Sequence, residues 1–306
     1  MRIIIAGGTG LIGTALTKSL ILDGNQVWIL SRNPGSANFV DGAQRVGWDG
    51  RSTTGWEGLV SQVDAIVNLA GDSLGSGSWT KARKIRIISS RVDAGQAISA
   101  AISMANPHPK VLIQASAVGV YGPRGSEPVT EDSPAGFGFL ANVCKEWEAS
   151  SQSVELLGVR RVVIRTGVVL SRDAEAFRRL LLPYRLFVGG PLGNGRQGFP
   201  WIHLTDEVAG IRYLLENDQA QGVYNLSAPE PLSNADFGRI LARVMGRPYW
   251  LPVPAFALRL LLGEMSTLVL EGQYMHPKRL HELGFSFRYE KAEPALREIL
   301  GAPSHS

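Results

Sequence analysis

Three glycines near the N-terminus have the spacing of a phosphate-binding loop. Gly7, Gly10 and Gly13 follow an apolar run at residues 3–6 and precede an amphipathic helical pattern. A dinucleotide loop needs one glycine at its tight turn, one where the backbone approaches the pyrophosphate and one where the helix packs on the strand. The helix N-terminus adds free N–H groups and a partial positive charge. The pattern predicts a dinucleotide site that includes Gly7, Thr9, Gly10, Leu11, Ile12 and Gly13.

The end of the second expected strand bears on which dinucleotide binds. An acid about 20 residues after the last glycine would hold the ribose 2′-hydroxyl of NAD(H), whereas an arginine suits the 2′-phosphate of NADP(H). Arg32 follows Gly13 by 19 residues, and its neighbour Ser31 can also hydrogen-bond a phosphate oxygen. Because neither position holds an acid, we expect NADP(H) in preference to NAD(H).

The segments that must position these residues alternate between strands and helices. A long helix is expected over residues 79–104, and its apolar face is assigned to Ile85, Ile88, Val92, Ile98 and Ile102. Short apolar runs predict strands at residues 3–6, 27–30, 65–70, 111–115 and 162–165. Strands that alternate with helices are typical of a parallel sheet. The sequence therefore predicts an α/β fold with a Rossmann-type, doubly wound parallel sheet.

The character of the sequence changes after about residue 170. Residues 189–195 are rich in glycine, residues 248–254 contain three prolines, and helices are expected at 236–245 and 256–262. We predict an NADP-binding domain over residues 1–170, with a sheet that later strands complete. A smaller α/β substrate domain is expected over residues 171–306.

Composition excludes several other classes of protein. Hydrophobic residues make up 44% of the 306 residues, which is enough for a sizeable core. The single cysteine, Cys144, excludes an intramolecular disulfide and a cysteine metal cluster, and we expect it to be buried. Lys and Arg exceed Asp and Glu by only 31 to 27, a small excess for a nucleic-acid-binding domain.

Local charge and hydropathy add further expectations. The run Lys81, Arg83, Lys84 and Arg86 is interpreted as the solvated face of a helix, with an anionic ligand or partner as the alternative. No apolar stretch is long enough to cross a membrane, and no secretory signal is seen. We expect a cytoplasmic protein, or a stromal one if it is of plastid type, with a small-molecule substrate and no metal site, nucleic-acid partner or membrane span.

Other motifs carry a resemblance to a known family. Asn68-Leu69-Ala70-Gly71 ends one expected strand, Val120-Tyr121-Gly122 follows another, and both accompany the glycine loop. Together they resemble the extended short-chain dehydrogenase/reductases, which are relatives of nucleotide-sugar epimerases and dehydratases. Residues 89–92, 115–119, 199–206, 263–265 and 272–273 resemble an atypical branch of that family. Its members are called epimerase family proteins and are often labelled SulA-like cell-division inhibitors, and the resemblance spans nearly the whole chain.

The resemblance implies further contacts with the cofactor. Leu69, Ala70 and Gly71 would lie against it. Arg91 stands on the helix that flanks the nicotinamide half in relatives, so we assign it a phosphate or ribose contact, with a surface ion pair as the alternative. Relatives often pair through two helices, and a homodimer is therefore a further hypothesis.

The resemblance also implies a Tyr-x-x-x-Lys pair, which this chain lacks. In relatives the tyrosine is the general acid/base, and the lysine lowers its pKa and holds the nicotinamide ribose. The tyrosine position falls here at Leu140, the lysine position at Cys144 and the accompanying serine position at Ala117. None of these three side chains can replace the usual groups.

Substitutes for the missing pair lie close by in the sequence. Tyr121 is a candidate acid/base in the loop after a strand, with Lys145 to lower its pKa and Ser116 beside it. The alternative for Tyr121 and Ser116 is a purely structural role.

Candidate substrate contacts lie in the second half of the chain. By resemblance, the stretch around His203 borders the substrate cleft, and Arg196 and Gln197 lie in the loop before it. A buried structural role is the alternative for His203. Asp206 is expected to cap a helix that begins near Glu207.

Two functions remain open from the sequence. The first is an NADP(H)-dependent oxidoreductase or epimerase that acts on a small polar or nucleotide-linked substrate, with Tyr121 or a bound water as proton relay. The second is a non-catalytic sensor of NADP(H), linked to cell or plastid division. The glycine loop and the substrate-type second domain favour the enzyme, whereas the missing Tyr and Lys favour the sensor.

Overall fold

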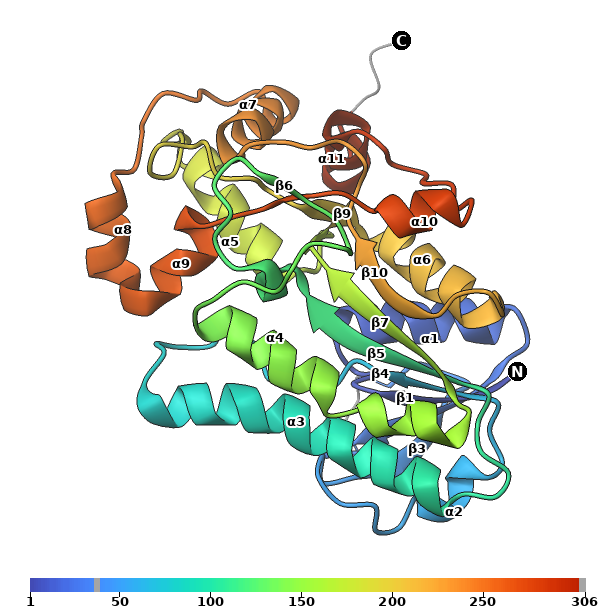
Figure 1. Cartoon of the computed structure of the whole chain (residues 1–306). Coiled ribbons are helices and arrows are strands. Elements are labelled where there is room, and N and C mark those ends of the chain that lie inside the picture. The colour runs from blue at the N-terminus through green and yellow to red at the C-terminus, as the bar shows by residue number, and fades with distance from the viewer. Residues whose placement is uncertain (36–38, 303–306) are drawn as a thin grey trace.

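A parallel sheet of seven strands forms the centre of the computed structural model, which describes residues 1–35 and 39–302 (Figure 1). The α/β, Rossmann-type prediction is confirmed. From one edge to the other, the strands are β3 (Gln44–Gly47), β2 (Gln26–Ser31), β1 (Arg2–Ala6), β4 (Ala65–Asn68), β5 (Val111–Ala117), β7 (Arg160–Thr166) and β10 (Gly222–Leu226). Strand order reverses its direction between β1 and β4, and ligands of such sheets bind beyond the carboxyl ends of the strands at this point.

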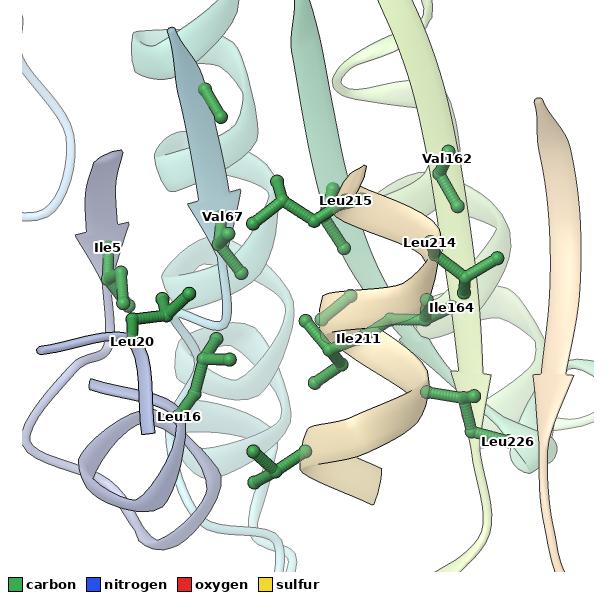
Figure 2. Packing of buried hydrophobic residues seen from close by; sticks show 14 of the residues in the cluster. Ile5, Leu16, Leu20, Val67, Val162, Ile164, Ile211, Leu214, Leu215 and Leu226 are labelled. Carbon is green, nitrogen blue, oxygen red and sulfur yellow. The ribbon is translucent and has the colours of Figure 1, made fainter. Parts of the chain in front are cut away.

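Helices cover both faces of the sheet, so its inner strands are apolar on both sides. In β1, Ile3 and Ile5 pack under α1 (Leu11–Leu22) and α6 (Leu204–Glu216), as Figure 2 shows for Ile5. Ile4 and Ala6 point the opposite way, toward α3 (Lys81–Met104). The alternation follows from strand geometry, in which successive side chains point to opposite faces. The smaller elements on the α3 side are α2 (Glu57–Val60), α4 (Phe139–Ala149) and η2 (Gln152–Leu157).

The expected helix over residues 79–104 forms as α3, but the predicted apolar face is wrong in part. Ile98 and Ile102 are buried, whereas Ile85 is 66% exposed. The buried face runs instead through Ile87, Arg91 and the small residues Ala94, Gly95, Ala97 and Ala101. Small side chains and an arginine occupy this face because α4 and η2 pack closely on it. Gly95 has no room for a side chain, since an added Cβ would lie 1.9 Å from the Ser150 hydroxyl.

A second, smaller group of elements stands over the carboxyl ends of the strands (Figure 1). It has its own core, in which Phe177, Trp201, Phe237 and Leu296 are buried. Its strands form two short parallel pairs: β8 (Val168–Leu170) with β9 (Trp201–His203), and β6 (Pro128–Val129) with β11 (Tyr274–Met275). The helices are η1 (Val118–Tyr121), α5 (Glu175–Arg185), α7 (Asn234–Met245), α8 (Ala255–Leu262), η3 (Gly263–Ser266), α9 (Thr267–Leu270), α10 (Lys278–Glu282) and α11 (Ala292–Leu300).

The chain passes more than once between this upper part and the sheet. After β9 it returns through α6, which packs beside α1 on the sheet, and through β10, which forms an edge strand. A later strand therefore completes the sheet, as expected. In the part of the chain that the structure describes, no helix has the length and hydrophobicity to cross a membrane, and no group of His, Cys, Asp and Glu could hold a metal ion.

Candidate functional site

The glycine loop connects β1 to α1 and is shaped by close backbone contacts. A Cβ at Gly7 would lie 2.6 Å from the Leu69 carbonyl oxygen, and one at Gly13 would lie 2.3 Å from the Gly7 carbonyl oxygen. Gly7 also has φ +78°, which side chains disfavour. At Gly10 an added Cβ would meet only the Gly7 carbonyl oxygen, at 3.3 Å. The fold therefore needs glycine at the outer two positions, while the space above Gly10 stays open to a ligand.

A pocket of about 530 Å³, here called the polar pocket, opens beside this loop over β1, β2 and β4. Of the residues assigned to the cofactor, Gly7, Thr9, Gly10, Ser31, Arg32, Leu69, Ala70 and Gly71 line it. Leu11 and Ile12 do not, because their side chains pack into the cores. They begin α1, whose first N–H groups have no partner within the helix. Gly13 packs on Gly7 and Gly8 beneath the loop.

Two buried amides shape the far wall of the polar pocket. The Asn68 side-chain oxygen accepts a hydrogen bond from the Ala70 N–H at 3.1 Å, which fixes the turn of residues 69–71. The Asn68 side-chain nitrogen donates in turn to Gln114 on β5 at 3.0 Å. Asn68 is fully buried at the end of a strand, where a polar residue requires such partners.

The outer end of the polar pocket is rich in arginine. Arg32 is exposed after β2, and among the described residues no acid pairs with it. Arg51 and Arg86 line the same pocket, as does Trp48. Trp48 and Arg51 were not predicted from the sequence, because β3 brings their loop beside β2 only in the folded chain. Arg86 belongs to the basic run for which an anionic ligand was the alternative. Arg51 lies 3.6 Å from Asp49, whose pKa is lowered by hydrogen bonds from the backbone N–H groups of Arg51 and Ser52.

A second pocket of about 570 Å³, here called the apolar pocket, lies over the ends of β5 and β7. Its lining includes Ala117, Leu140 and Cys144, which stand where relatives carry their Ser, Tyr and Lys. The three predicted positions therefore lie together at one pocket. Burial raises the pKa of the Cys144 thiol to about 11, so it is neutral near pH 7, and the expectation that it is buried is confirmed.

The proposed substitute acid/base does not reach either pocket. Tyr121 ends η1 and is fully buried, and its hydroxyl donates to the Asn225 side-chain oxygen at 2.6 Å. The same hydroxyl accepts from the Arg165 guanidinium at 3.1 Å. Burial raises the pKa of Tyr121, although Arg165 opposes the shift. Tyr121 therefore joins η1 to β7 and β10, which is the structural role given as the alternative to a proton relay.

The two helpers assigned to Tyr121 are also placed elsewhere. The Ser116 hydroxyl donates to a Glu148 carboxylate oxygen at 2.6 Å, and that carboxylate pairs with Arg165 at 2.9 Å. Lys145 lies on the exposed face of α4, where its amine is 3.5 Å from the Gly136 carbonyl oxygen. Cys144 and Lys145 are adjacent on α4, and neighbouring helix positions point in different directions. Cys144 therefore faces the pocket while Lys145 faces solvent.

Arg91 stands between the two pockets. It is 8% exposed and borders the apolar pocket, and its guanidinium donates to the carbonyl oxygens of Ile87 at 2.9 Å and Asp72 at 3.0 Å. The guanidinium also lies 4.9 Å from the centre of the Trp147 ring. Asp72 itself borders the polar pocket. The alternative of a surface ion pair is therefore excluded, and Arg91 is held where the two halves of the cleft meet.

The basic run before Arg91 is only partly a solvated helix face. Lys81 and Arg86 are exposed. Arg83, however, is buried and pairs with Asp72 at 2.5 Å. Lys84 pairs with Glu264 of η3, which lies far along the chain. Two of the four cations thus tie α3 to other segments around the pockets.

Only one of the three candidate substrate contacts lines a pocket. His203 is 4% exposed and caps α6, because its Nδ1 accepts from the Thr205 N–H at 3.1 Å while Nε2 lies 3.0 Å from Glu298. It lines neither pocket, and burial lowers its pKa, which fits the buried structural role given as the alternative. Arg196 is exposed outside the pocket lining, whereas its neighbour Gln197 lines the apolar pocket.

The predicted helix cap is also corrected. His203 holds the N-cap position that was expected of Asp206, since α6 begins at Leu204. The Asp206 carboxylate accepts instead from the N–H groups of Arg288 and Tyr289 at 2.8 and 2.9 Å. It therefore anchors the C-terminal segment onto α6.

Comparison with known proteins is consistent with this geometry. The sequence model of the NAD dependent epimerase/dehydratase family matches residues 3–227, and a domain of unknown function (DUF1731) matches residues 253–299. The epimerase family protein YfhF of Bacillus subtilis is 40% identical over 301 residues, which cover 98% of each chain. The epimerase family protein SAR0825 of Staphylococcus aureus is 36% identical over 299 residues, or 97% of this chain and 98% of the relative.

A solved structure agrees with these sequence matches. The human epimerase family protein SDR39U1, crystallised with NADPH, superposes with a TM-score of 0.89 at 35% identity and covers 98% of this chain and 99% of its own. The resemblance to epimerase family proteins within the short-chain dehydrogenase/reductases is confirmed. The chain belongs to the NAD dependent epimerase/dehydratase family.

Proposed function

We propose that this protein is an NADP(H)-dependent oxidoreductase. The observation that carries the proposal is the end of β2, where Ser31 and Arg32 line the polar pocket, neither position holds an acid for a ribose 2′-hydroxyl, and Arg32 has no acid partner among the described residues. Asp49 of the neighbouring loop also lines the pocket, but its carboxylate accepts hydrogen bonds from the N–H groups of Arg51 and Ser52. An arginine without a protein partner suits a phosphate monoester, which it can hold with two parallel hydrogen bonds. Arg51 and Arg86 add positive charge to the same end.

The remaining cofactor contacts follow the length of the cleft. The open space above Gly10 and the N-terminus of α1 suit a pyrophosphate. Leu69, Ala70 and Gly71 would border the ribose that follows, and Arg91 would contact the nicotinamide end. When bound there, the dinucleotide supplies hydride chemistry at its nicotinamide ring. This fit is supported by the human relative, whose structure contains NADPH.

Proton transfer needs a different solution from that of the usual family site. Leu140 and the neutral Cys144 stand at the Tyr and Lys positions, and Tyr121 is buried behind them. The burial of Tyr121 away from both pockets favours water over Tyr121 as the relay, and we propose that the proton comes from solvent in the apolar pocket. Neither the relatives nor the site geometry supports the alternative of a non-catalytic sensor or a role in cell division.

The test combines binding with turnover. NADPH is titrated into the purified protein by fluorescence, and its oxidation is then followed by absorbance with a panel of aldehydes, ketones and nucleotide sugars. The proposal expects tight binding and oxidation with at least one carbonyl compound. Gly10→Val protein is the control, because it should fold but lack both signals. Binding of NADPH that no compound on the panel oxidises would contradict the enzymatic proposal.

A further inference from the structure

The walls of the apolar pocket are built from aliphatic and aromatic side chains of distant segments. The first turns of α4, the segment before α3, α5 and the C-terminal η3–α9 region each supply part of them. Representative side chains are Trp79, Phe139, Val143, Leu180, Phe199 and Leu268. A cavity with such walls favours a ligand that buries apolar surface.

Both cations around the apolar pocket are already bonded to an acid or to the backbone. Within the described part of the chain, two cations and two acids border it: Lys84, Arg91, Glu264 and Glu271. Lys84 pairs with Glu264, and Arg91 donates to two backbone carbonyl oxygens. The diphosphate of a nucleotide sugar would thus enter a wall without an uncommitted cation, although burial of its two charges requires partners.

The amide side chains at the pocket hold its walls together. Gln197 donates to the carbonyl oxygens of Leu192 at 3.1 Å and Val269 at 2.7 Å, which joins the glycine-rich loop to α9. Gln273 donates to the Gly122 carbonyl oxygen at 2.6 Å. The N–H groups that donate these three hydrogen bonds are therefore not available to the hydroxyls of a sugar ring.

The exposed part of the lining contains apolar side chains beside the acids Glu264 and Glu271. Phe137 is 74% exposed and Leu268 is 38% exposed, and both line the pocket. Single exposed apolar residues are common on proteins, but these two stand at one opening that leads into an apolar cavity. An apolar ligand would cover them as it enters.

We propose that the apolar pocket binds an uncharged, largely apolar carbonyl compound, in place of the small polar or nucleotide-linked substrate that the sequence suggests. This inference rests on the proposed oxidoreductase function. In the reaction, the electrophilic carbon of the substrate accepts a hydride with its electron pair, and water protonates the oxygen or the adjacent carbon. One C=O or C=C bond is reduced, and one NADPH is oxidised to NADP⁺.

Binding is measured without turnover, so that it is tested separately from the enzymatic function. Protein with and without NADP⁺ is titrated by calorimetry with cinnamyl alcohol, which carries the apolar ring of an aromatic enal, and with UDP-glucose. The proposal expects cinnamyl alcohol to bind at least tenfold more tightly than UDP-glucose. Tighter binding of UDP-glucose would overturn it while leaving the oxidoreductase function intact. A protein that binds cinnamyl alcohol but not NADP⁺ or NADPH would contradict the proposed function alone.

A matched pair of variants locates the binding. Leu268→Gln places an amide at the mouth of the pocket and should weaken cinnamyl alcohol about five- to tenfold, because part of the apolar contact is lost. Leu261→Gln changes the same residue type on α8, where Leu261 is 79% exposed outside the pocket lining, and should leave affinity unchanged. Equal effects of the two variants, or no effect of either, would show that the ligand binds elsewhere and would overturn the proposal.

Discussion

The polar pocket is lined by backbone, serine, arginine and aspartate, whereas the apolar pocket beside it is lined mainly by aliphatic and aromatic side chains, and its two cations are bonded to an acid or to the backbone. Both lie beyond the carboxyl ends of strands in one sheet, and they meet at Asp72 and Arg91. The difference indicates that the two pockets suit different chemical groups. The polar pocket would neutralise phosphate charge, while the apolar pocket would bury the apolar surface of an uncharged reactant.

A substitution at Gly10 should have the largest effect on cofactor binding in the polar pocket. In Gly10→Val protein the side chain would fill the space that a pyrophosphate needs, so affinity for NADPH and NADH should both fall by more than about a hundredfold. Fluorescence titration measures both affinities. Thermal unfolding should change little, since at Gly10 an added Cβ has only one close neighbour, at 3.3 Å. Retention of NADPH binding would place the pyrophosphate elsewhere.

Arg32→Asp tests whether the polar end recognises the 2′-phosphate. Loss of a charge-assisted contact should weaken NADPH by about ten- to a hundredfold, while NADH changes by less than about threefold. Calorimetric titration of the two dinucleotides gives this ratio. Arg185→Asp, which reverses an exposed arginine on α5 outside the polar pocket, is the control and should not alter either affinity. Equal losses for NADPH and NADH in the Arg32 variant would contradict recognition of the 2′-phosphate there.

The protonation state of Glu207 tests whether the carboxyl group buried beside the apolar pocket is uncharged. It is fully buried on α6, bonded to Thr166 at the pocket lining, and burial raises its pKa to about 8 from an ordinary value of 4.5. Between these pH values the folded protein holds a proton that the unfolded chain has lost, so the free energy of unfolding should fall as pH rises. Glu207→Gln should remove on the order of 2 kcal/mol of this fall, measured by urea unfolding at several pH values. An unchanged pH dependence would show that Glu207 is ionised in the folded protein.

Tyr121→Phe should have the smallest effect of these changes and should separate structure from catalysis. Loss of the hydroxyl removes one partner of the Arg165 guanidinium and the partner of the Asn225 side-chain oxygen, at a cost of about 1–2 kcal/mol in the free energy of unfolding. Arg165 keeps its pair with Glu148. The turnover rate with NADPH should change by less than about threefold. A loss of turnover with normal stability would restore Tyr121 as the proton relay.

The same comparison explains what could be predicted from the sequence. The glycine loop, Ser31, Arg32 and residues 69–71 were found because each is a local motif at the end of a strand. Leu140 and Cys144, predicted to stand at the Tyr and Lys positions, both line the apolar pocket. The role of Tyr121 depends on Arg165 and Asn225, which lie 44 and 104 residues away, and no local pattern indicates such partners.

Long-range contacts account for the other errors as well. His203 reads as a polar residue near a cleft, but Glu298 of the C-terminal helix engages its ring. Ile85 fits an apolar stripe, yet α4 and η2 pack against a face of α3 that is rich in small residues. The walls of the apolar pocket come from segments between residues 74 and 273, so its character could be known only from the folded chain.

The most direct test of the account is the affinity of the unaltered protein for NADPH and for NADH, measured by calorimetry at the same ionic strength. The account predicts that NADPH binds at least about tenfold more tightly, because Arg32 meets the 2′-phosphate in a pocket without an acid at that position. Equal affinities, or tighter binding of NADH, would contradict it.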